Sequence, residues 1–192
     1  MMKSNFYSLE ELLSIGFEKV SSTALISRKA SIYGAENMEI GDHVRIDDFC
    51  ILSGRIKIGA YVHISAYTAI YASFGVEIND FVTISGRVSI YSQNDDYSGE
   101  FMTNPMLPEQ FTNKTGGKVL LEKYSIIGAG SIILPSVKID EGSCVASLSL
   151  VKSSLEPWKM YGGIPAIYLK DRKKDLIKLA AEFNNNIKDS NL

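Results

Sequence analysis

The sequence has few cysteines and histidines: Cys50, Cys144, His43 and His63 are all it contains among its 192 residues. Two cysteines so far apart fit neither a metal-ligand spacing nor the disulfide framework of a small secreted protein. No apolar run approaches the roughly 18 residues that span a membrane, and the polar N-terminus does not read as a signal peptide. The sequence therefore predicts a cytoplasmic protein that carries no metal.

A charge excess is also missing. Lys and Arg number 20 against 22 Asp and Glu, so the formal net charge is −2. Without a basic excess, nucleic acid is not the expected main partner. Hydrophobic residues make up 45% of the chain, enough for one domain with a sizeable core.

What the sequence does contain is a six-residue repeat. Aliphatic residues recur at Ile40, Ile46, Leu52, Ile58, Ile64 and Ile70. Neither the 3.6-residue period of a helix nor the alternation of an ordinary strand gives this spacing, whereas a short-period solenoid does. A second inward residue is expected four positions after each: Val44, Cys50, Ile56, Val62, Thr68 and Phe74. Three such hexads would make one triangular coil.

The repeat predicts an all-β solenoid domain over residues 20–170, with one long interruption. From 95 to 117 there is no hexad, and the segment is rich in the turn formers Gly, Pro, Asn and Ser. A loop of this length inside a compact domain is uncommon and is usually functional. The repeat resumes at Leu121 and continues to Val151.

Helices are expected at both ends of the solenoid. Ser8 and Glu11 form a capping-box pattern, which predicts a helix over residues 8–15 in a capping region 1–19. After the Gly/Pro break at 161–166, a helix is expected from Asp171 to Asn186 within the C-terminal region 171–192. Its apolar stripe consists of Leu176, Leu179, Ala180, Phe183 and Ile187.

The hexads, the loop at Asp95, the segment 127–131 (IGAGS) and the closing Gly163-Ile164-Pro165-Ala166 resemble the hexapeptide-repeat acyltransferases. More narrowly, segments 45–54 and 95–99 are similar to nucleotide-sugar N-acyltransferases that acylate the 4-amino group of a dTDP-4-amino-4,6-dideoxyhexose. The resemblance implies a left-handed parallel β-helix, an acyl-CoA donor, and a homotrimer with active sites between subunits. It also implies a role in making surface polysaccharides or other glycans.

The usual catalyst of the family is a histidine in a pattern like Tyr-Thr-x-x-His, and here Asp95 occupies the histidine's place in the segment 91–95. A sugar hydroxyl needs a competent base, and a carboxylate of pKa about 4 is a weak one. A neutral primary amine is already a good nucleophile, so a carboxylate needs only to orient it and stabilise charge. Asp95 therefore favours an amine acceptor and is the first catalytic candidate. Ser85, ten residues earlier, is the second.

Further candidates surround these two. Asn94, Asp96, Tyr97 and Glu100 lie near Asp95 in sequence, and Arg45, Asp47 and Tyr71 have the side chains that a diphosphate, a base and a stacking ring would need. The resemblance points to Gly128, Ala129, Ala146 and Ser147 for the pantetheine groove of CoA. It points to Lys152 and Arg172 for the CoA phosphates.

Other interpretations remain open. Asp95-Asp96 also fits a solvated turn, and the basic residues near Arg172 also fit a solvated helix face. One alternative function is a sugar O-acetyltransferase with His63, at an outward-facing corner, as base. Another is a non-catalytic β-helix that serves as a binding or assembly module.

Overall fold

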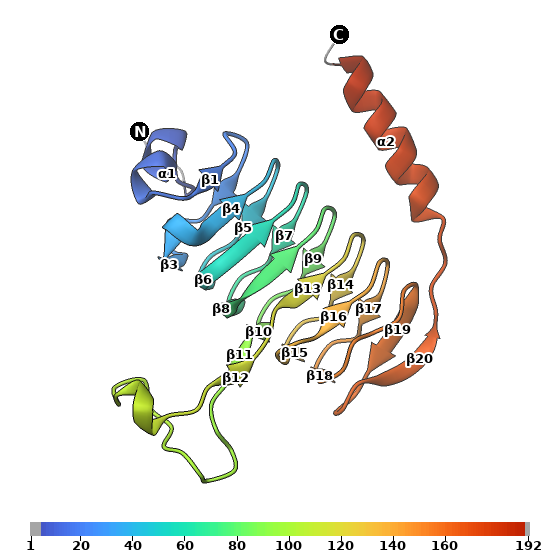
Figure 1. Ribbon diagram of the computed structural model, residues 1–192. Helices are drawn as coiled ribbons and strands as arrows, with labels where there is room; N and C mark the ends of the chain where they lie inside the picture. Colours follow the sequence, from blue (N-terminus) through green and yellow to red (C-terminus); the bar gives the residue numbers. More distant parts are fainter. Residues whose placement is uncertain (1–4, 191–192) are drawn as a thin grey trace.

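The computed structural model describes residues 5–190 and shows one parallel β-helix with a helix near each end (Figure 1). The chain is the left-handed parallel β-helix that the resemblance implied. Each coil has three short sides, and the strands of successive coils stack in register to form three faces. The inward aliphatic residue of each hexad fills the space between these faces.

The first face is a column of parallel strands, closed at its end by an antiparallel one. Its strands are β2 (Leu25–Ile26), β5 (Arg45–Ile46), β7 (His63–Ile64), β9 (Thr83–Ile84), β14 (Ile126–Ile127), β17 (Cys144–Val145), β19 (Lys159–Gly162) and the closing β20 (Ile167–Asp171).

The second and third faces share two long strands that bend from one face to the other, β6 (Ile51–Ile58) and β8 (Ala69–Ile78). The second face also contains β3 (Ser31–Tyr33), β10 (Ser89–Tyr91), β15 (Ile132–Ile133) and β18 (Leu150–Val151). The third also contains β1 (Lys19–Val20), β4 (Met38–Ile40), β13 (Val119–Leu121) and β16 (Lys138–Ile139); the short helix η1 (Ala35–Asn37) precedes β4.

The hexad prediction is confirmed by burial. The six aliphatic residues from Ile40 to Ile70 are each at most 2% exposed. Phe74, predicted to point inward, is 42% exposed, so that assignment is wrong. β8 carries extra residues at this corner, and Ala72, 1% exposed, takes the inward place.

One corner of the coil carries a column of stacked rings. His43, Tyr61, Phe81, Tyr124 and Trp158 all have left-handed φ angles of 54–62°. Successive ring centroids lie 4.8, 5.3, 5.4 and 6.4 Å apart. A left-handed φ costs about 1–2 kcal/mol for a residue with a side chain. Aromatic stacking of about 0.5–1.5 kcal/mol per pair offsets much of that strain.

The N-terminal helix prediction is confirmed. α1 (Leu9–Ile15) begins after the N-cap Ser8, with both hydrogen bonds of the capping box to Glu11, and ends at Gly16 in the left-handed conformation. Its Leu12 is buried in the core of the first coil.

The predicted start of the C-terminal helix is wrong: α2 (Leu176–Ser190) begins after Asp171, because β20 still pairs with β19 there. Phe183 packs its edge on Tyr61 at 5.1 Å between ring centroids, which places α2 along the column of rings. The Ile187 side chain lies outside the described residues. No helix among residues 5–190 is long and apolar enough to cross a bilayer.

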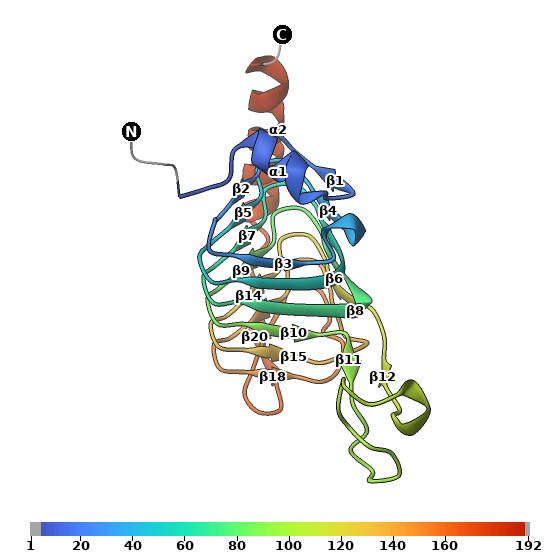
Figure 2. The same ribbon diagram turned by 90° about the vertical axis from the view of Figure 1, so that its left-hand side faces the viewer.

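The interruption at 95–117 forms an arm that leaves the coil. It is opened by β11 (Gln93–Asn94) and closed by β12 (Thr115–Gly116), which pair antiparallel, and it contains the short helix η2 (Glu109–Phe111). The arm projects away from the β-helix in both views (Figures 1 and 2). It therefore interrupts the chain between β10 of the second face and β13 of the third, while β10 still pairs with β15 of a later coil.

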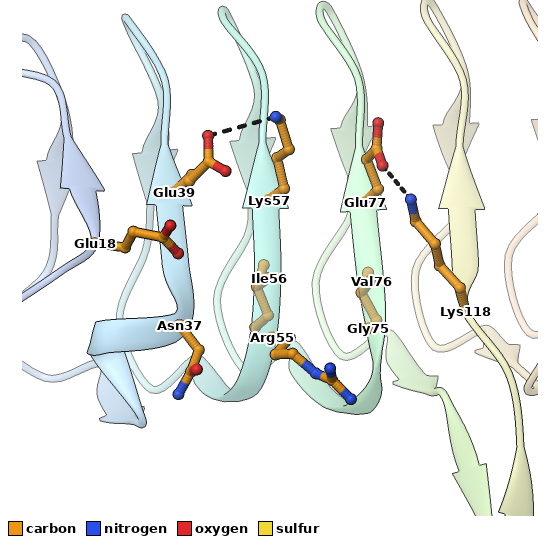
Figure 3. Close-up of a pocket in the computed structure, with 10 residues that line it drawn as sticks. All are labelled: Glu18, Asn37, Glu39, Arg55, Ile56, Lys57, Gly75, Val76, Glu77 and Lys118. Carbon is orange, nitrogen blue, oxygen red and sulfur yellow. Dashed lines mark hydrogen bonds and ion pairs between the residues drawn. The ribbon is translucent and has the colours of Figure 1, made fainter.

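The third face is a ladder of opposite charges, shown in Figure 3. Lys57 Nζ lies 3.4 Å from Glu39 Oε2, and Lys118 pairs with Glu77 in the next coils. A cavity of about 270 Å³ lies here. Because these charges neutralise one another across coils and none is a catalytic candidate, we assign this face a structural role.

Replacing an inward isoleucine should be far more damaging than replacing its outward neighbour. Ile133 is fully buried, whereas Ile132 beside it is 40% exposed. Ile133→Ala should lower the free energy of unfolding by about 2–5 kcal/mol, and Ile132→Ala by less than about 1 kcal/mol. Denaturant unfolding of both variants measures this, and equal losses would contradict the inward assignment.

Candidate active site

Ser85 lies at the end of the first face, in a row of small or polar residues that occupy the same place in successive coils. The backbone N–H of Asp47 donates to Ile64, that of Ser65 to Ile84, and that of Ser85 to Ile127, at 2.9–3.0 Å. Ser85 therefore stands between Ser65 and Gly128. Its hydroxyl has no hydrogen-bond partner within residues 5–190, so it is available to a ligand.

Gly128 continues this row and brings two coils unusually close. A Cβ at Gly128 would lie 2.4 Å from the backbone nitrogen of Ser147 and 2.6 Å from the carbonyl carbon of Ala146. Ala129 and Ser147 are exposed beside it. The structure thus brings the four residues expected along pantetheine to one place, next to Ser85, where little side-chain bulk covers the backbone.

Asp95 lies just beyond β11, where the arm begins, and its side chain is exposed. The neighbouring Asn94 pairs with Thr115 across the hairpin. A Cβ at Gly116 would lie 2.2 Å from the carbonyl oxygen of Ser92, so only glycine permits this close crossing. The hairpin therefore holds Asp95 at the rim of the coil.

Asp96 faces the arm itself. Its carboxylate accepts hydrogen bonds from the Ser98 hydroxyl and the Gly99 backbone N–H, both at 2.9 Å. The bond from Ser98, joined by those from backbone N–H groups, lowers the pKa of Asp96 below its usual value. Asp96 thus shapes the turn at 96–101, while Tyr97 and Glu100 in the same turn are exposed.

Ser85 and Asp95 lie at opposite ends of the second face. Ser85 precedes β10 and Asp95 follows β11, and Figure 2 shows β10 crossing the face between them. At about 3.3 Å per extended residue, the strand and its corners separate the two by on the order of 15 Å. Within one chain, therefore, the two side chains do not meet.

A charged cluster occupies the N-terminal part of the first face. Asp47 accepts from Arg45 Nε at 2.7 Å and lies 2.8 Å from His63 Nε2. Partial burial raises the pKa of Asp47, but hydrogen bonds from Arg45 and His63 outweigh it and hold the pKa below its usual value. His63 lies within β7 and not at a corner, which corrects its predicted place.

The sequence analysis did not predict that Arg45, Asp47 and His63 contact one another, although their spacing indicates it. His63 and Arg45 are 18 residues apart and pair in register, because three hexads separate neighbours in adjacent coils that lack an insertion. Residues 18 apart on the first face are therefore neighbours.

Tyr71 stacks on Tyr91 on the second face, with ring centroids 5.3 Å apart and planes 14° from parallel. Tyr91 belongs to the strand that leads to Asp95. Tyr71 is 38% exposed, so one ring of the pair remains open to a ligand near the base of the arm.

The two cations expected near CoA lie at the C-terminal coils. Lys152 is exposed after β18. Arg172 donates from Nη1 to the carbonyl oxygens of Tyr124, Gly142 and Ser143. Arg172 therefore ties the chain leading to α2 onto the coils.

Comparison with known proteins gives full-length matches. The chain is 45% identical over 176 residues, 90% of its length, to the dTDP-4-amino-4,6-dideoxy-D-glucose acyltransferase of Escherichia coli, 92% of which is covered. It is 48% identical to AntD, an N-acyltransferase from Bacillus cereus in complex with dTDP and 3-hydroxybutyryl-CoA. That comparison covers 97% of this chain and all of AntD, with a TM-score of 0.94.

Further structures extend the comparison. AntD has also been solved as variants at a serine and at an aspartate ten residues later. A putative acetyltransferase of Bacillus cereus, 21% identical with a TM-score of 0.66 and covering 88% of this chain and 86% of its own, shares the fold. No family model matches the chain.

The charged cluster predicts a pH dependence of stability. Because the folded-state pKa of Asp47 is lowered, its carboxylate stabilises the fold at pH values above its ordinary pKa of about 3.9. That contribution is lost as the pH falls through the lowered value. Asp47→Asn should therefore flatten the acid-side decline of the unfolding free energy between about pH 5 and pH 2.

Denaturant unfolding at a series of pH values measures this slope. Glu182→Gln, at an exposed position on α2, serves as the matched control and should keep the slope of the original protein. An Asp47→Asn slope equal to that of the original protein would show that the cluster does not stabilise the fold.

Proposed function

We propose that the protein acylates the 4-amino group of dTDP-4-amino-4,6-dideoxyglucose. The premise is that the chain belongs to the CoA-dependent N-acyltransferases of dTDP-linked amino sugars, a group within the hexapeptide-repeat acyltransferases. The observation that carries the proposal is Asp95 at the break of the repeat, where a histidine would serve a hydroxyl acceptor. The relatives supply the substrates: the enzyme of Escherichia coli is named for this sugar, and AntD binds dTDP and an acyl-CoA.

In this reaction the amine nitrogen attacks the thioester carbonyl, the C–N bond forms, the C–S bond breaks, and the amine proton leaves with the CoA thiol. Asp95 would hold and orient the amine and stabilise the positive charge that develops on nitrogen. The Ser85 hydroxyl, which has no partner among the described residues, would donate to the carbonyl oxygen as it becomes an oxyanion. The serine and aspartate varied in AntD have the same ten-residue spacing as Ser85 and Asp95, which supports these assignments.

We also propose a homotrimer with each site between two subunits. Ser85 and Asp95 of one chain are too far apart to share one amine, so an adjacent copy would supply the missing residue. The arm exposes apolar side chains that such a copy would cover, among them Tyr97 at 92%, Met106 at 87% and Met102 at 56%. Gly128, Ala129, Ala146 and Ser147 would line the pantetheine groove at the same junction.

We place the protein in the cytoplasm, because acyl-CoA and nucleotide sugars are metabolites of that compartment. The free thiols of Cys50 and Cys144 suit its reducing conditions.

One observation favours a second candidate, a sugar O-acetyltransferase. The hydrogen bond between Asp47 and His63 is the arrangement that orients a histidine as general base. His63 lies on the first face, in register with Thr83 and two residues short of the row of Ser85. A base there would serve a hydroxyl acceptor.

Two substitutions separate the candidates. With acetyl-CoA or 3-hydroxybutyryl-CoA and the amino-sugar nucleotide, Asp95→Asn should lower kcat by about 100-fold or more, because the isosteric amide removes the charge. His63→Ala should stay within about threefold of the original rate. Mass spectrometry of the product, before and after hydroxylamine, identifies the bond, since an amide survives and an ester does not.

The opposite pattern, in which His63→Ala abolishes turnover and Asp95→Asn retains it, would reject the mechanism and favour the O-acetyltransferase. Thermal stabilisation by acetyl-CoA tests donor binding separately from turnover.

Subunit complementation tests the shared site. Ser85→Ala and Asp95→Ala chains are mixed, unfolded and refolded together. If each site takes Ser85 from one subunit and Asp95 from another, random assembly restores about a quarter of the sites. If both residues come from one chain, every site lacks one of them and the mixture stays as inactive as either variant alone.

A further inference from the structure

A second column of stacked groups lies at the corner between the first and second faces. Phe49, Tyr67 and Arg87 share left-handed φ angles of 61–63° at equivalent positions of successive coils. The rings of Phe49 and Tyr67 lie 5.0 Å apart, and the guanidinium carbon of Arg87 lies 5.8 Å from the centroid of Tyr67. Lys29 caps the other end, 5.3 Å from Phe49. The column therefore has a cation at each end.

The two cations differ in their partners. Lys29 Nζ lies 2.9 Å from a carboxylate oxygen of Asp48. The guanidinium of Arg87 has no oxygen partner within the described part of the chain and contacts the Tyr67 ring. This guanidinium is held by a ring and keeps its donors free.

The other four arginines are engaged with protein oxygens. Arg28 pairs with Glu11, Arg45 with Asp47, Arg55 donates to the Ser73 carbonyl oxygen, and Arg172 donates to three carbonyl oxygens. Arg45 was expected from the sequence to bind the diphosphate, but its Nε–H already donates a hydrogen bond to the Asp47 carboxylate.

Arg87 is exposed to solvent. Gly130 follows it in the column, and its backbone N–H donates to Gly86 at 3.0 Å. Gly130 has no side chain, so this residue adds no bulk beside the guanidinium. A Cβ there would lie 2.7 Å from Leu148 Cδ2, so the Leu148 side chain of the following coil reaches over Gly130.

Arg87 also stands at the proposed site, two residues after Ser85. In a 4-amino nucleotide sugar, the diphosphate is attached to C1, across the ring from the amine. If the amine lies at Ser85 and Asp95, the diphosphate on the far side of the sugar ring would lie beside a nearby cation, and Arg87 is such a cation. A guanidinium binds phosphate oxygens in bidentate fashion, and its stacking on Tyr67 limits the freedom lost on binding.

We propose that Arg87 binds the diphosphate of the nucleotide sugar and is the residue that distinguishes the nucleotide-linked sugar from the free sugar. This inference rests on the proposed function and names the group that recognises its acceptor. Arg87 acts through substrate binding and takes no part in proton transfer.

Calorimetric titration with dTDP, thymidine and CoA tests the proposal. Arg87→Ala should weaken dTDP binding about 10-fold or more and leave the affinities for thymidine and CoA within about twofold. Arg87→Lys should recover part of the loss. In turnover, the KM for the nucleotide sugar should rise by a similar factor while kcat changes less than about threefold.

Arg55→Ala, at another exposed arginine on a corner, is the matched control and should bind all three ligands as the original protein does. Unchanged dTDP affinity in Arg87→Ala would overturn the proposal. If Arg87→Ala loses affinity for CoA and not for dTDP, Arg87 binds the donor phosphates and the proposal is rejected. If light scattering shows a fall in the mass of the assembly, Arg87 forms a subunit contact and the proposal is likewise rejected.

Failure of the proposed function gives a different result. If the original protein does not acylate the dTDP-amino sugar, that function is rejected whatever the variants do. Titration with UDP and pyrophosphate then still tests Arg87, because a diphosphate site would bind them with the same dependence on the guanidinium.

Discussion

The constraint on which the structure depends is the packing of one aliphatic side chain per six residues inside a narrow triangular coil. Ile46, Ile64, Ile84 and Ile127 lie one above another behind the first face and are fully buried. Because each coil is held to the next by backbone hydrogen bonds and this close packing, the outer surface of the face is rigid. The row that includes Ser85 and Gly128 inherits its spacing from those inward residues.

The corners are where this regular scaffold acquires distinct roles. Left-handed φ angles point aromatic and basic side chains outward, and stacking offsets the backbone strain. One column, from His43 to Trp158, receives Phe183 of α2 on its rings. The other ends at Arg87 beside Ser85. Asp95 is positioned differently, by the hairpin of β11 and β12 at the point where the chain leaves the coil.

The sequence predicted the scaffold well because the inward position has one physical requirement, an aliphatic side chain of fixed size. It failed at Phe74, where extra residues in β8 moved the inward place to Ala72, and at the start of α2, where β20 closes the first face. The capping box at Ser8 was read correctly because its chemistry is local. Contacts between coils, such as Asp47 with His63, depend on register and were missed.

The site was harder to predict than the fold. Asp95 could be singled out because it interrupts a repeat, and Ser85 because it precedes it by ten residues. Their separation across the second face is seen only in the three-dimensional structure. This separation is the reason for proposing that a second copy of the chain completes the site. Arg87 carried no sequence signal of its own, since only the partners of the other arginines set it apart.

The most direct test of the central claim, that an aspartate at the break in the repeat selects an amine acceptor, is a competition between two acceptors. The enzyme is given acetyl-CoA with equal amounts of dTDP-4-amino-4,6-dideoxyglucose and its 4-hydroxyl counterpart, and the products are measured by mass spectrometry. The account predicts the amide as the product, with ester formation at least about 100-fold slower. Comparable rates for the two acceptors would contradict it.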